Sequence, residues 1–468
     1  MNSAGSAWEG DKTMITNLTP YPAYKDSGVR WLGKVPEHWE LMPVKRALRP
    51  QSCGNVAIKN TAAATPLDGY APAFSASGQD VWLPRALHRG SALVLSAVGA
   101  RCGKTFRADG EWGVVANTHI LWHRPGQNRD YWWYVTNNEA WWDKAGAAQP
   151  FVRVSATLER SWVIPPLPEQ TAIVRFLDYM DRRIRRSIRA KQKLIKLLEE
   201  YRQALIHQAV TGQIDVRTGK PYPAYKDSGV PWLGKVPEHW EVRRLKTAVD
   251  HVNQQTTTKT DEDLYIALEH VESWTGRLLP PSGEAHFDGQ VKRFQAGDVL
   301  FGKLRPYLAK VVRPKQSGVC VGEFLVLRAR PVVARHYLEV ALRSAPAIDF
   351  VNSSTYGAKM PRAEWTFVGA MLFPVPPLPE QTAVVEYLDT KMAKLDAAFA
   401  AARREIELLR EYRERLIADV VTGKVDVRGV AAQLPDEPPD QEAGTEEEEP
   451  VADELATVDS QEEANGEE

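Results

Sequence analysis

The sequence is organised as two copies of one plan. "YPAYKDSGVRWLGKVPEHWE" (residues 21–40) returns as "YPAYKDSGVPWLGKVPEHWE" (residues 222–241), and nineteen of the twenty positions are identical. The displacement of 201 residues is too long for a solenoid, whose repeats span about 20–50 residues. The chain is therefore expected to fold as a duplicated set of domains and not around one continuous core.

Two further stretches repeat, and their spacing separates a fixed interval from a variable one. "PPLPEQTAIVRFLD" (165–178) recurs as "PPLPEQTAVVEYLD" (376–389), and "LIHQAVTGQIDVRTG" (205–219) recurs as "LIADVVTGKVDVRG" (416–429). Both are displaced by 211 residues. The interval between these two stretches therefore has the same length in both copies, whereas the interval that precedes them differs by ten residues.

The fixed interval predicts a long helix in each half, over residues 166–211 and 377–423. A glutamate stands in the first turn of each helix, where acidic groups suit the helix dipole, and a glycine follows the last turn. Apolar residues recur at steps of three and four, which is the heptad stripe of a helix that pairs with another helix. The stripe residues are Ile173, Leu177, Met180, Ile184, Leu198, Leu205, Val385, Leu388, Met392, Leu395, Phe399, Ile406 and Leu409.

Two arrangements of these helices remain open. Each helix could pack on its own domain, or the two could pair as an antiparallel coiled coil with one globular domain at each end. The narrow stripe, sustained in both halves, favours pairing. The expected fold is thus mixed α/β (α+β), with two globular domains joined by two long antiparallel helices in a pseudo-twofold duplication.

The two globular domains, at 18–165 and 212–376, have diverged in sequence. Strand-like runs coincide at a displacement of 206 residues: "SALVLSAV" with "GDVLFGKL", and "VVANTHILWH" with "CVGEFLVLRA". Only six of thirty-six aligned positions are identical there. The domains are therefore expected to keep one fold while they present different surfaces.

Charge is divided between a basic body and an acidic tail. Residues 431–468 hold fifteen acidic residues and no Lys or Arg, so the net charge of −1 becomes +14 for the remaining residues. We expect the tail at 430–468 and the N-terminal extension at 1–17 to be disordered. The tail is either a solvated appendage or a polyanion that competes with DNA, and a basic body suggests a polyanionic partner.

The sequence offers no convincing catalytic, cofactor or metal site. "GARCGKT" (99–105) lacks the glycine spacing of a phosphate loop, and the two histidines of "HILWH" (119–123) lie in a β-prone run without the glutamate of a zinc motif. The three cysteines are far apart, which argues against disulfides or a paired-cysteine zinc site. No apolar run reaches the roughly 20 residues of a membrane span and no signal peptide is seen, so we expect a cytoplasmic protein.

Binding residues are better represented. Cations beside tyrosines and small polar residues suit phosphate contacts and base-edge reading, although solvated turns and strand ends have the same composition. The candidate DNA-binding residues are Arg101, Lys104, Arg107, Arg153, Lys303, Arg305, Tyr307, Lys310, Tyr356 and Lys359.

The repeated motifs, taken together, resemble the specificity (S) subunit of type I restriction–modification systems. The residues that carry the resemblance are the paired "YKDSGV-x-WLGKVPEHWE" segments, the paired "PPLPEQ" helix starts and the paired "VTG-x-[IV]DVR" exits. The acidic tail is a departure from the family pattern. Two alternatives stay open: a protein-only assembly scaffold that binds no DNA, and an enzyme, such as a nuclease, with an unrecognised site.

The resemblance implies a non-catalytic DNA-binding subunit. Its two target-recognition domains would each read one half of a bipartite double-stranded DNA site, while the paired helices set the spacer. Two methyltransferase (modification) subunits would bind the scaffold and bring S-adenosylmethionine to methylate adenine. Motor–nuclease (restriction) subunits, where present, would use ATP and Mg²⁺. The chain itself would bind no cofactor.

Overall fold

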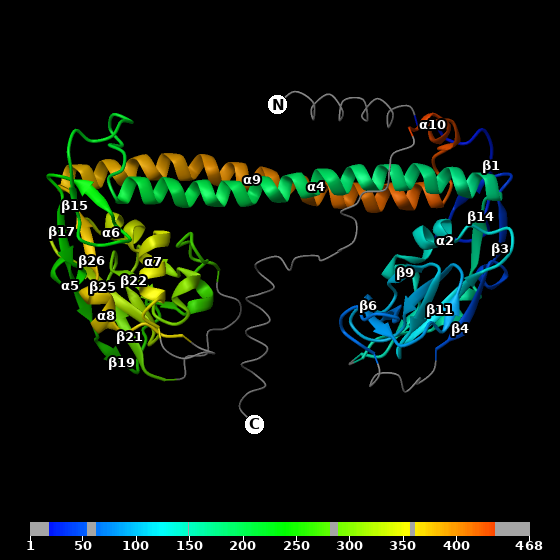
Figure 1. The fold of residues 1–468 in the computed structure, drawn as a ribbon, viewed down its shortest axis with the longest axis horizontal. Coiled ribbons are helices and arrows are strands. Elements are labelled where there is room, and N and C mark those ends of the chain that lie inside the picture. Colours follow the sequence, from blue (N-terminus) through cyan, green and yellow to red (C-terminus); the bar gives the residue numbers. More distant parts are fainter. Residues whose placement is uncertain (1–17, 54–61, 148, 281–288, 356–360, 436–468) are drawn as a thin grey trace. The chain divides into compact units, whose positions relative to one another are not determined.

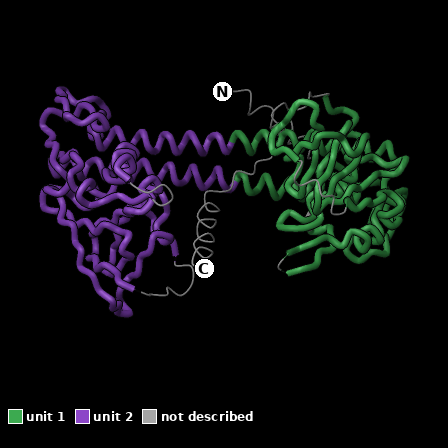
Figure 2. The backbone as a smooth tube through the Cα atoms, turned by 60° about the horizontal axis from the view of Figure 1, so that its bottom comes forward, with its two compact units in different colours: residues 1–190, 405–445 green, residues 191–404, 446–468 purple. Residues whose placement is uncertain are grey.

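The computed structural model describes residues 18–53, 62–147, 149–280, 289–355 and 361–435. The chain divides into two compact units (Figures 1 and 2). Unit 1 comprises residues 1–190 and 405–445, and unit 2 comprises residues 191–404 and 446–468. Each unit therefore takes part of both sequence copies. The predicted N-terminal extension and the acidic tail from residue 436 onward lie outside the described residues.

Unit 1 holds two four-stranded sheets. In the first, β11 pairs antiparallel with β4 and β8, giving the order β4-β11-β8-β9. The second has the order β6-β5-β10-β7, with β10 parallel to β5. The remaining strands form three two-stranded pairs, β1-β2, β3-β14 and β12-β13. The elements are β1 (Tyr24–Asp26), β2 (Lys34–Pro36), β3 (Glu40–Pro43), η1 (Val44–Arg46), β4 (Leu48–Ser52), β5 (Ala71–Ser75), β6 (Gly78–Leu83), β7 (His88–Arg89), β8 (Ala92–Ser96), β9 (Thr105–Ala108), β10 (Glu111–Val114), β11 (Thr118–His123), α2 (Arg129–Thr136), η2 (Glu139–Trp141), β12 (Lys144–Ala145), β13 (Phe151–Val152), α3 (Val154–Leu158) and β14 (Ser161–Ile164).

Unit 2 repeats this plan with different residues. One sheet has the order β18-β25-β22-β23 and the other β19-β21-β24-β20, and β15-β16 and β17-β26 form the two-stranded pairs. The elements are β15 (Tyr225–Asp227), β16 (Lys235–Pro237), β17 (Glu241–Arg244), α5 (Leu245–Ala248), β18 (Val249–Val252), β19 (Gln255–Thr256), β20 (Leu264–Ile266), η3 (Leu268–His270), β21 (Val291–Phe294), β22 (Val299–Gly302), η4 (Pro306–Leu308), β23 (Val311–Val312), β24 (Gly318–Val321), β25 (Phe324–Ala329), α6 (Arg335–Leu342), α7 (Ala345–Asn352), α8 (Trp365–Ala370) and β26 (Leu372–Val375). The strand-like runs that align between the two sequence copies form the neighbouring strands β8 and β11 in unit 1 and β22 and β25 in unit 2.

Two long helices, α4 (Leu167–Val210) and α9 (Leu378–Val421), contribute to both units. Each has 44 residues, or about 66 Å at about 1.5 Å per residue. Within unit 1 the first turns of α4 share a buried cluster with the last turns of α9, and within unit 2 the last turns of α4 share one with the first turns of α9. The helices are therefore antiparallel in each unit, and the prediction of two β-rich domains with two long packed helices is confirmed.

The predicted stripe faces inward along both helices. Leu198, Met392 and Leu409 are half-buried, and the other predicted stripe residues are buried. Charged pairs join the helices beside the stripe: Asp181 with Arg413 in unit 1, and Arg202 with Asp396 in unit 2. The apolar seam thus supplies packing, and the flanking ion pairs favour one register.

Three local features refine the expectations from sequence. "GARCGKT" forms the turn between β8 and β9, in agreement with the rejection of a phosphate loop. The histidines of "HILWH" lie on strand β11. Residues 430–433, expected in the disordered tail, belong to helix α10 (Arg428–Gln433), and Leu434 is buried in the unit 1 core. The difference arises because apolar side chains here cover the end of α9 before the acidic residues begin.

Candidate nucleic-acid interface and its supporting junctions

The repeated twenty-residue segment folds onto the start of a long helix. In unit 1 the buried carboxylate of Glu169, in the first turn of α4, accepts hydrogen bonds from the Tyr21 hydroxyl, from His38 Nε2 at 2.8 Å and from Trp39 Nε1 at 3.0 Å. Trp39 is fully buried. One carboxylate therefore fastens three side chains of the repeated segment to the helix.

Unit 2 contains the same junction. The buried carboxylate of Glu380, in the first turn of α9, accepts from the Tyr222 hydroxyl at 3.0 Å, His239 Nε2 at 2.8 Å and Trp240 Nε1 at 2.8 Å. The helix dipole also favours a carboxylate at this end. The sequence pattern identified the glutamates as first-turn residues but did not reveal that they are the centres of these networks.

The third repeated motif completes each junction. In unit 2 Arg217 forms a two-pronged pair with Asp215 at 2.8 and 3.0 Å and lies 3.4 Å from the Glu380 carboxylate. In unit 1 Arg428 forms the corresponding pair with Asp426 and lies over the Tyr21 ring. The exit of one helix is thus joined to the start of the other.

The hydrogen bonds fix the protonation state of this network. Burial alone would raise the pKa of Glu380, but hydrogen bonds from Trp240, His239 and Tyr222 favour the carboxylate and hold its pKa below the usual value. Burial and the bond to the carboxylate raise the pKa of Tyr222 and of Tyr21 far above the usual value. At neutral pH the carboxylate of Glu380 accepts and the tyrosines donate.

The glutamine that follows each glutamate anchors the neighbouring globular domain. Gln170 Oε1 accepts from the backbone N–H of Asn128, which caps α2, and its Nε2 donates to the Pro165 carbonyl. Gln381 makes the same pair of contacts with the Ala334 N–H and the Pro376 carbonyl. The "PPLPEQ" motif therefore connects a helix, a repeated segment and a β-rich domain, which accounts for its recurrence.

The predicted DNA-binding residues of unit 1 lie in different environments. Arg101 is exposed and Lys104 is half-buried in the β8–β9 turn. Arg153 is exposed and pairs with Asp143 at 2.9 Å. Arg107 instead pairs with Asp130 at 3.0 Å and Asp178 at 3.3 Å and stacks on the Trp133 ring, so its guanidinium serves the packing of α2 against α4. The four residues are thus divided between exposed or half-exposed positions and the packing of the domain.

The predicted residues of unit 2 are similarly divided. Lys303 and Arg305 are half-buried, and Arg305 has a left-handed backbone at the start of η4, where the neighbouring Tyr307 is 44% exposed. Lys310 donates to the Leu268 carbonyl at 2.9 Å, and burial lowers its pKa, so it packs within the domain. Tyr356 and Lys359 lie outside the described residues.

Two open surface hollows, one in each unit, are lined by polar and charged side chains. In unit 2 Lys303 borders a hollow of about 400 Å³ with His251, Asn253, Gln255 and Lys292. Amide side chains can hydrogen-bond to base edges, and lysines to phosphates or bases. Lys292 is buried and already donates to the Phe324 carbonyl at 2.8 Å, and Glu323 and Glu364 share the lining. The residues that suit base reading are therefore Asn253, Gln255 and Lys303, of which only Lys303 was singled out from sequence.

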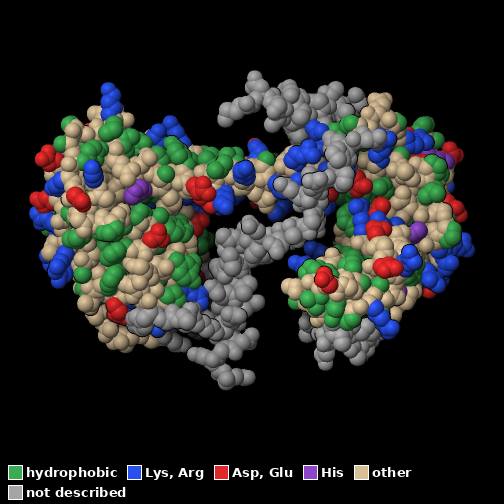
Figure 3. All heavy atoms as spheres, in the orientation of Figure 1, with side chains coloured by type: hydrophobic (Ala, Val, Ile, Leu, Met, Phe, Trp, Pro, Cys, Tyr) green, Lys and Arg blue, Asp and Glu red, His purple; other side chains and the backbone are tan. Residues whose placement is uncertain are grey.

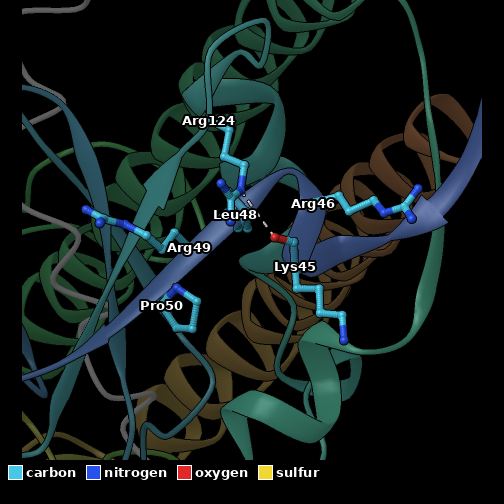
Figure 4. A pocket seen from close by; sticks show the side chains of 6 residues that line it. All are labelled: Lys45, Arg46, Leu48, Arg49, Pro50 and Arg124. Carbon is cyan, nitrogen blue, oxygen red and sulfur yellow. Dashed lines mark hydrogen bonds between the residues drawn. The ribbon is translucent and has the colours of Figure 1, made fainter.

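The second hollow, in unit 1, is strongly basic. Lys45, Arg46, Arg49 and Arg124 line a volume of about 470 Å³ together with Leu48 and Pro50 (Figure 4). Sequence analysis missed these residues, although "VKRALR" (44–49), three residues after the first repeat, was a visible signal. Figure 3 shows Lys and Arg side chains spread over both units. The positive net charge of the protein body therefore does not single out this hollow.

The parts of the chain that the structure describes contain no group of three or more His, Cys, Asp or Glu side chains placed to hold a metal ion. Their helices also include none that is long and apolar enough to cross a membrane.

Two curated proteins that are similar to this chain are both specificity subunits of type I restriction enzymes. No protein-family model matches. The chain is 22% identical over 411 residues to the Escherichia coli type I restriction enzyme EcoDI specificity subunit, covering 84% of this chain and 90% of that protein. The E. coli EcoBI specificity subunit is 29% identical over 75 residues, 16% of each chain.

A solved structure shares the fold. It is described as showing complex assembly and conformational transition of the type I R-M system, and one of its chains aligns with a TM-score of 0.62 at 16% identity. The alignment covers 83% of this chain and 98% of that one. The arrangement of two β-rich domains and two long helices is therefore one that is already known.

Proposed function

We infer that this chain reads a bipartite DNA site and that each β-rich domain reads one half-site. It would do so as the DNA target-specificity subunit of a type I restriction–modification system. The observation that carries this proposal is the contrast between the two halves. The junctions are nearly identical, whereas the aligned β-strand regions share only six of thirty-six residues. Divergent readers on a duplicated frame suit a target whose two halves differ in sequence.

The near-identity of the repeated segments extends to residues that the junction does not use. Lys25, Lys34 and Glu37 are exposed, and within the described residues their side chains make no hydrogen bond or ion pair. All three recur unchanged and exposed at the equivalent positions of unit 2. Internal packing cannot select them, so contact with the same partner in both units is the simplest cause. We propose that each surface docks one methyltransferase subunit.

Catalysis then belongs to those partners. The methyltransferase subunits would supply S-adenosylmethionine and the restriction subunits, where present, ATP and Mg²⁺. This chain would position the DNA by phosphate contacts and select it by base contacts. The equal lengths of α4 and α9 support their role as a spacer between the half-sites.

The proposed assignment is tested by mapping methyladenine in genomic DNA with and without the gene. Loss of one split motif, with two defined halves around a fixed gap, is expected. Exchange of the β-rich domain of unit 1 for that of a homologue should then change one half and leave the other unchanged. If both halves change together, or no motif depends on the gene, the assignment of one half-site to each domain is wrong.

The docking proposal has its own matched test. Lys25→Glu with Lys34→Glu alters unit 1, and Lys226→Glu with Lys235→Glu makes the same change in unit 2. Native mass spectrometry should show loss of one methyltransferase copy for either pair and of both copies for the four-fold variant. Retention of two copies in the four-fold variant would place docking elsewhere.

A further inference from the structure

The basic hollow of unit 1 has a close structural counterpart in unit 2. The backbone N–H of Arg124 bonds to the Ala47 carbonyl at 2.9 Å, and that of Arg330 bonds to the Ala248 carbonyl at 2.9 Å. Leu48 pairs with His123 and Val249 pairs with Ala329, so the strands that carry the two arginines have the same register. Both arginine side chains also reach a carbonyl at 3.4 Å in the turn before the edge strand, at positions one residue apart: Lys45 in unit 1 and Thr247 in unit 2. The two sites can therefore be compared position by position.

The charges at these positions differ sharply. Lys45 corresponds to Lys246, and Arg124 to Arg330, but Arg46 corresponds to Thr247 and Arg49 to Asp250. In unit 2 Asp250 accepts from the Arg330 guanidinium at 2.6 and 3.0 Å. At these four positions the charge is +4 in unit 1 and +1 in unit 2, where the arginine is already paired. Just before them unit 2 carries the exposed Arg244, where unit 1 has Pro43.

The cations of unit 1 are available for a ligand. Within the described part of the chain, Arg46 and Arg49 are exposed and make no side-chain hydrogen bond or ion pair. Lys45 approaches Glu159 at 3.6 Å, but both side chains are more than half exposed, and such pairs contribute little. Solvent weakens the repulsion among these exposed cations, so they can stay charged and free to pair with an anion.

The arrangement suits an extended anion more than a single small one. In Figure 4 the side chains of Arg46 and Arg49 extend to opposite sides of Arg124, and Lys45 extends in a third direction. Side chains that spread in this way can contact successive charges along a strand. Arginine and lysine are also the usual ligands of nucleic-acid phosphates.

We propose that Lys45, Arg46, Arg49 and Arg124 of unit 1 bind the phosphate backbone of the DNA, and that the corresponding surface of unit 2 does not. The inference rests on the proposed DNA-reading function and deepens it. One half-site is therefore held by an additional sequence-independent contact that the other lacks. The asymmetry adds affinity without adding base selectivity, because phosphates carry no sequence information.

The test uses pairs of equivalent substitutions in the complex of this chain with its methyltransferase subunits. Arg49→Asp copies the unit 2 arrangement into unit 1, and Lys45→Ala is matched by Lys246→Ala. Dissociation constants are measured for a target duplex and a scrambled duplex over a range of salt concentrations. All three positions carry exposed side chains, and circular dichroism and native mass spectrometry confirm folding and assembly of each variant.

Arg49→Asp should weaken binding of both duplexes by a similar factor. It should also make the slope of log affinity against log salt shallower by about one for each phosphate that the variant no longer binds. Lys45→Ala should act in the same direction, and Lys246→Ala should leave the slope unchanged. Equal effects of Lys45→Ala and Lys246→Ala would refute the asymmetry.

Other outcomes would overturn the proposal in different ways. An unchanged slope in Arg49→Asp would show that DNA does not touch this surface, and loss of a methyltransferase copy would show a protein-docking surface instead. If the wild-type complex does not distinguish the two duplexes, the proposed function fails, while the salt slopes still report on this surface. The two failures are therefore distinguishable.

Discussion

Replacing Glu380 with alanine is the sharpest test of the junction. The Tyr222 hydroxyl and the Trp240 indole N–H are buried, and both donate to this carboxylate, at 3.0 and 2.8 Å. A buried donor left without an acceptor costs about 1–3 kcal/mol. The His239 side chain is 47% exposed and can bond to water instead. The two buried donors therefore predict a loss of about 4 kcal/mol in the free energy of unfolding of unit 2.

Calorimetry of the full-length chain is the suitable assay because the two units can unfold in separate transitions. For a unit of this size the loss corresponds to a fall in melting temperature on the order of 10 °C. Glu169→Ala should lower the transition of unit 1 in the same way. Glu386→Ala, an exposed position nearly two turns further along α9, is the control. If Glu380→Ala and Glu386→Ala shift the unit 2 transition equally, the carboxylate does not support the junction.

Three further predictions concern acid stability, a helix-end glycine and the length of the paired helices. The folded state holds the pKa of Glu380 below its usual 4.5, so the contribution of this carboxylate to stability is complete above pH 4.5 and is lost as the pH falls. Glu380→Gln should therefore flatten the acid limb of a curve of unfolding free energy against pH. An unaltered acid limb would contradict this. Gly212→Ala should destabilise unit 2 more than Gly219→Ala does in denaturant titrations. Both glycines have a φ near +70°, but only at Gly212 would an added Cβ lie 2.4 Å from Pro237. Equal losses of stability would show that the contact with Pro237 is relieved without cost. Deleting one heptad from the middle of both α4 and α9 shortens each helix by about 10 Å. Methyladenine mapping should then show a methylated motif whose spacer is shorter by about three base pairs, and an unchanged spacer would refute the spacer role. Deletion from one helix alone should abolish modification.

The large elements of this fold were predictable because their signals are periodic. The heptad stripe from Ile173 to Leu409 identified two helices and their buried face, and the paired motifs identified the duplication. Strand runs such as those of β8 and β22 were visible because both faces of these central strands are buried, which gives continuous apolar sequence.

Side-chain roles were less predictable because they depend on contacts between distant residues. Arg107 looks like a DNA-contacting cation in the sequence, but Asp178 on α4, 71 residues away, is what engages its guanidinium in the structure. Arg49 belongs to the basic run "VKRALR", but the run alone does not show which of its cations lie beside Arg124. The registers of β4 and β18 set Arg49 against Asp250, which is the difference on which the proposed phosphate contact of unit 1 rests.

The junctions explain why one interval of the sequence is fixed in length and another is not. In unit 1 the start of α4 meets the exit of α9, and in unit 2 the start of α9 meets the exit of α4. Each helix must therefore present its glutamate at one junction and its glycine and arginine at the other. A change in the length of one helix alone would displace a buried carboxylate from its donors at one end. Each β-rich domain is anchored to the junction of its own unit, through Gln170 or Gln381, so the ten-residue difference between the domains carries no such penalty. Selection on the junctions thus fixes the helices in pairs and leaves the reading surfaces free to diverge.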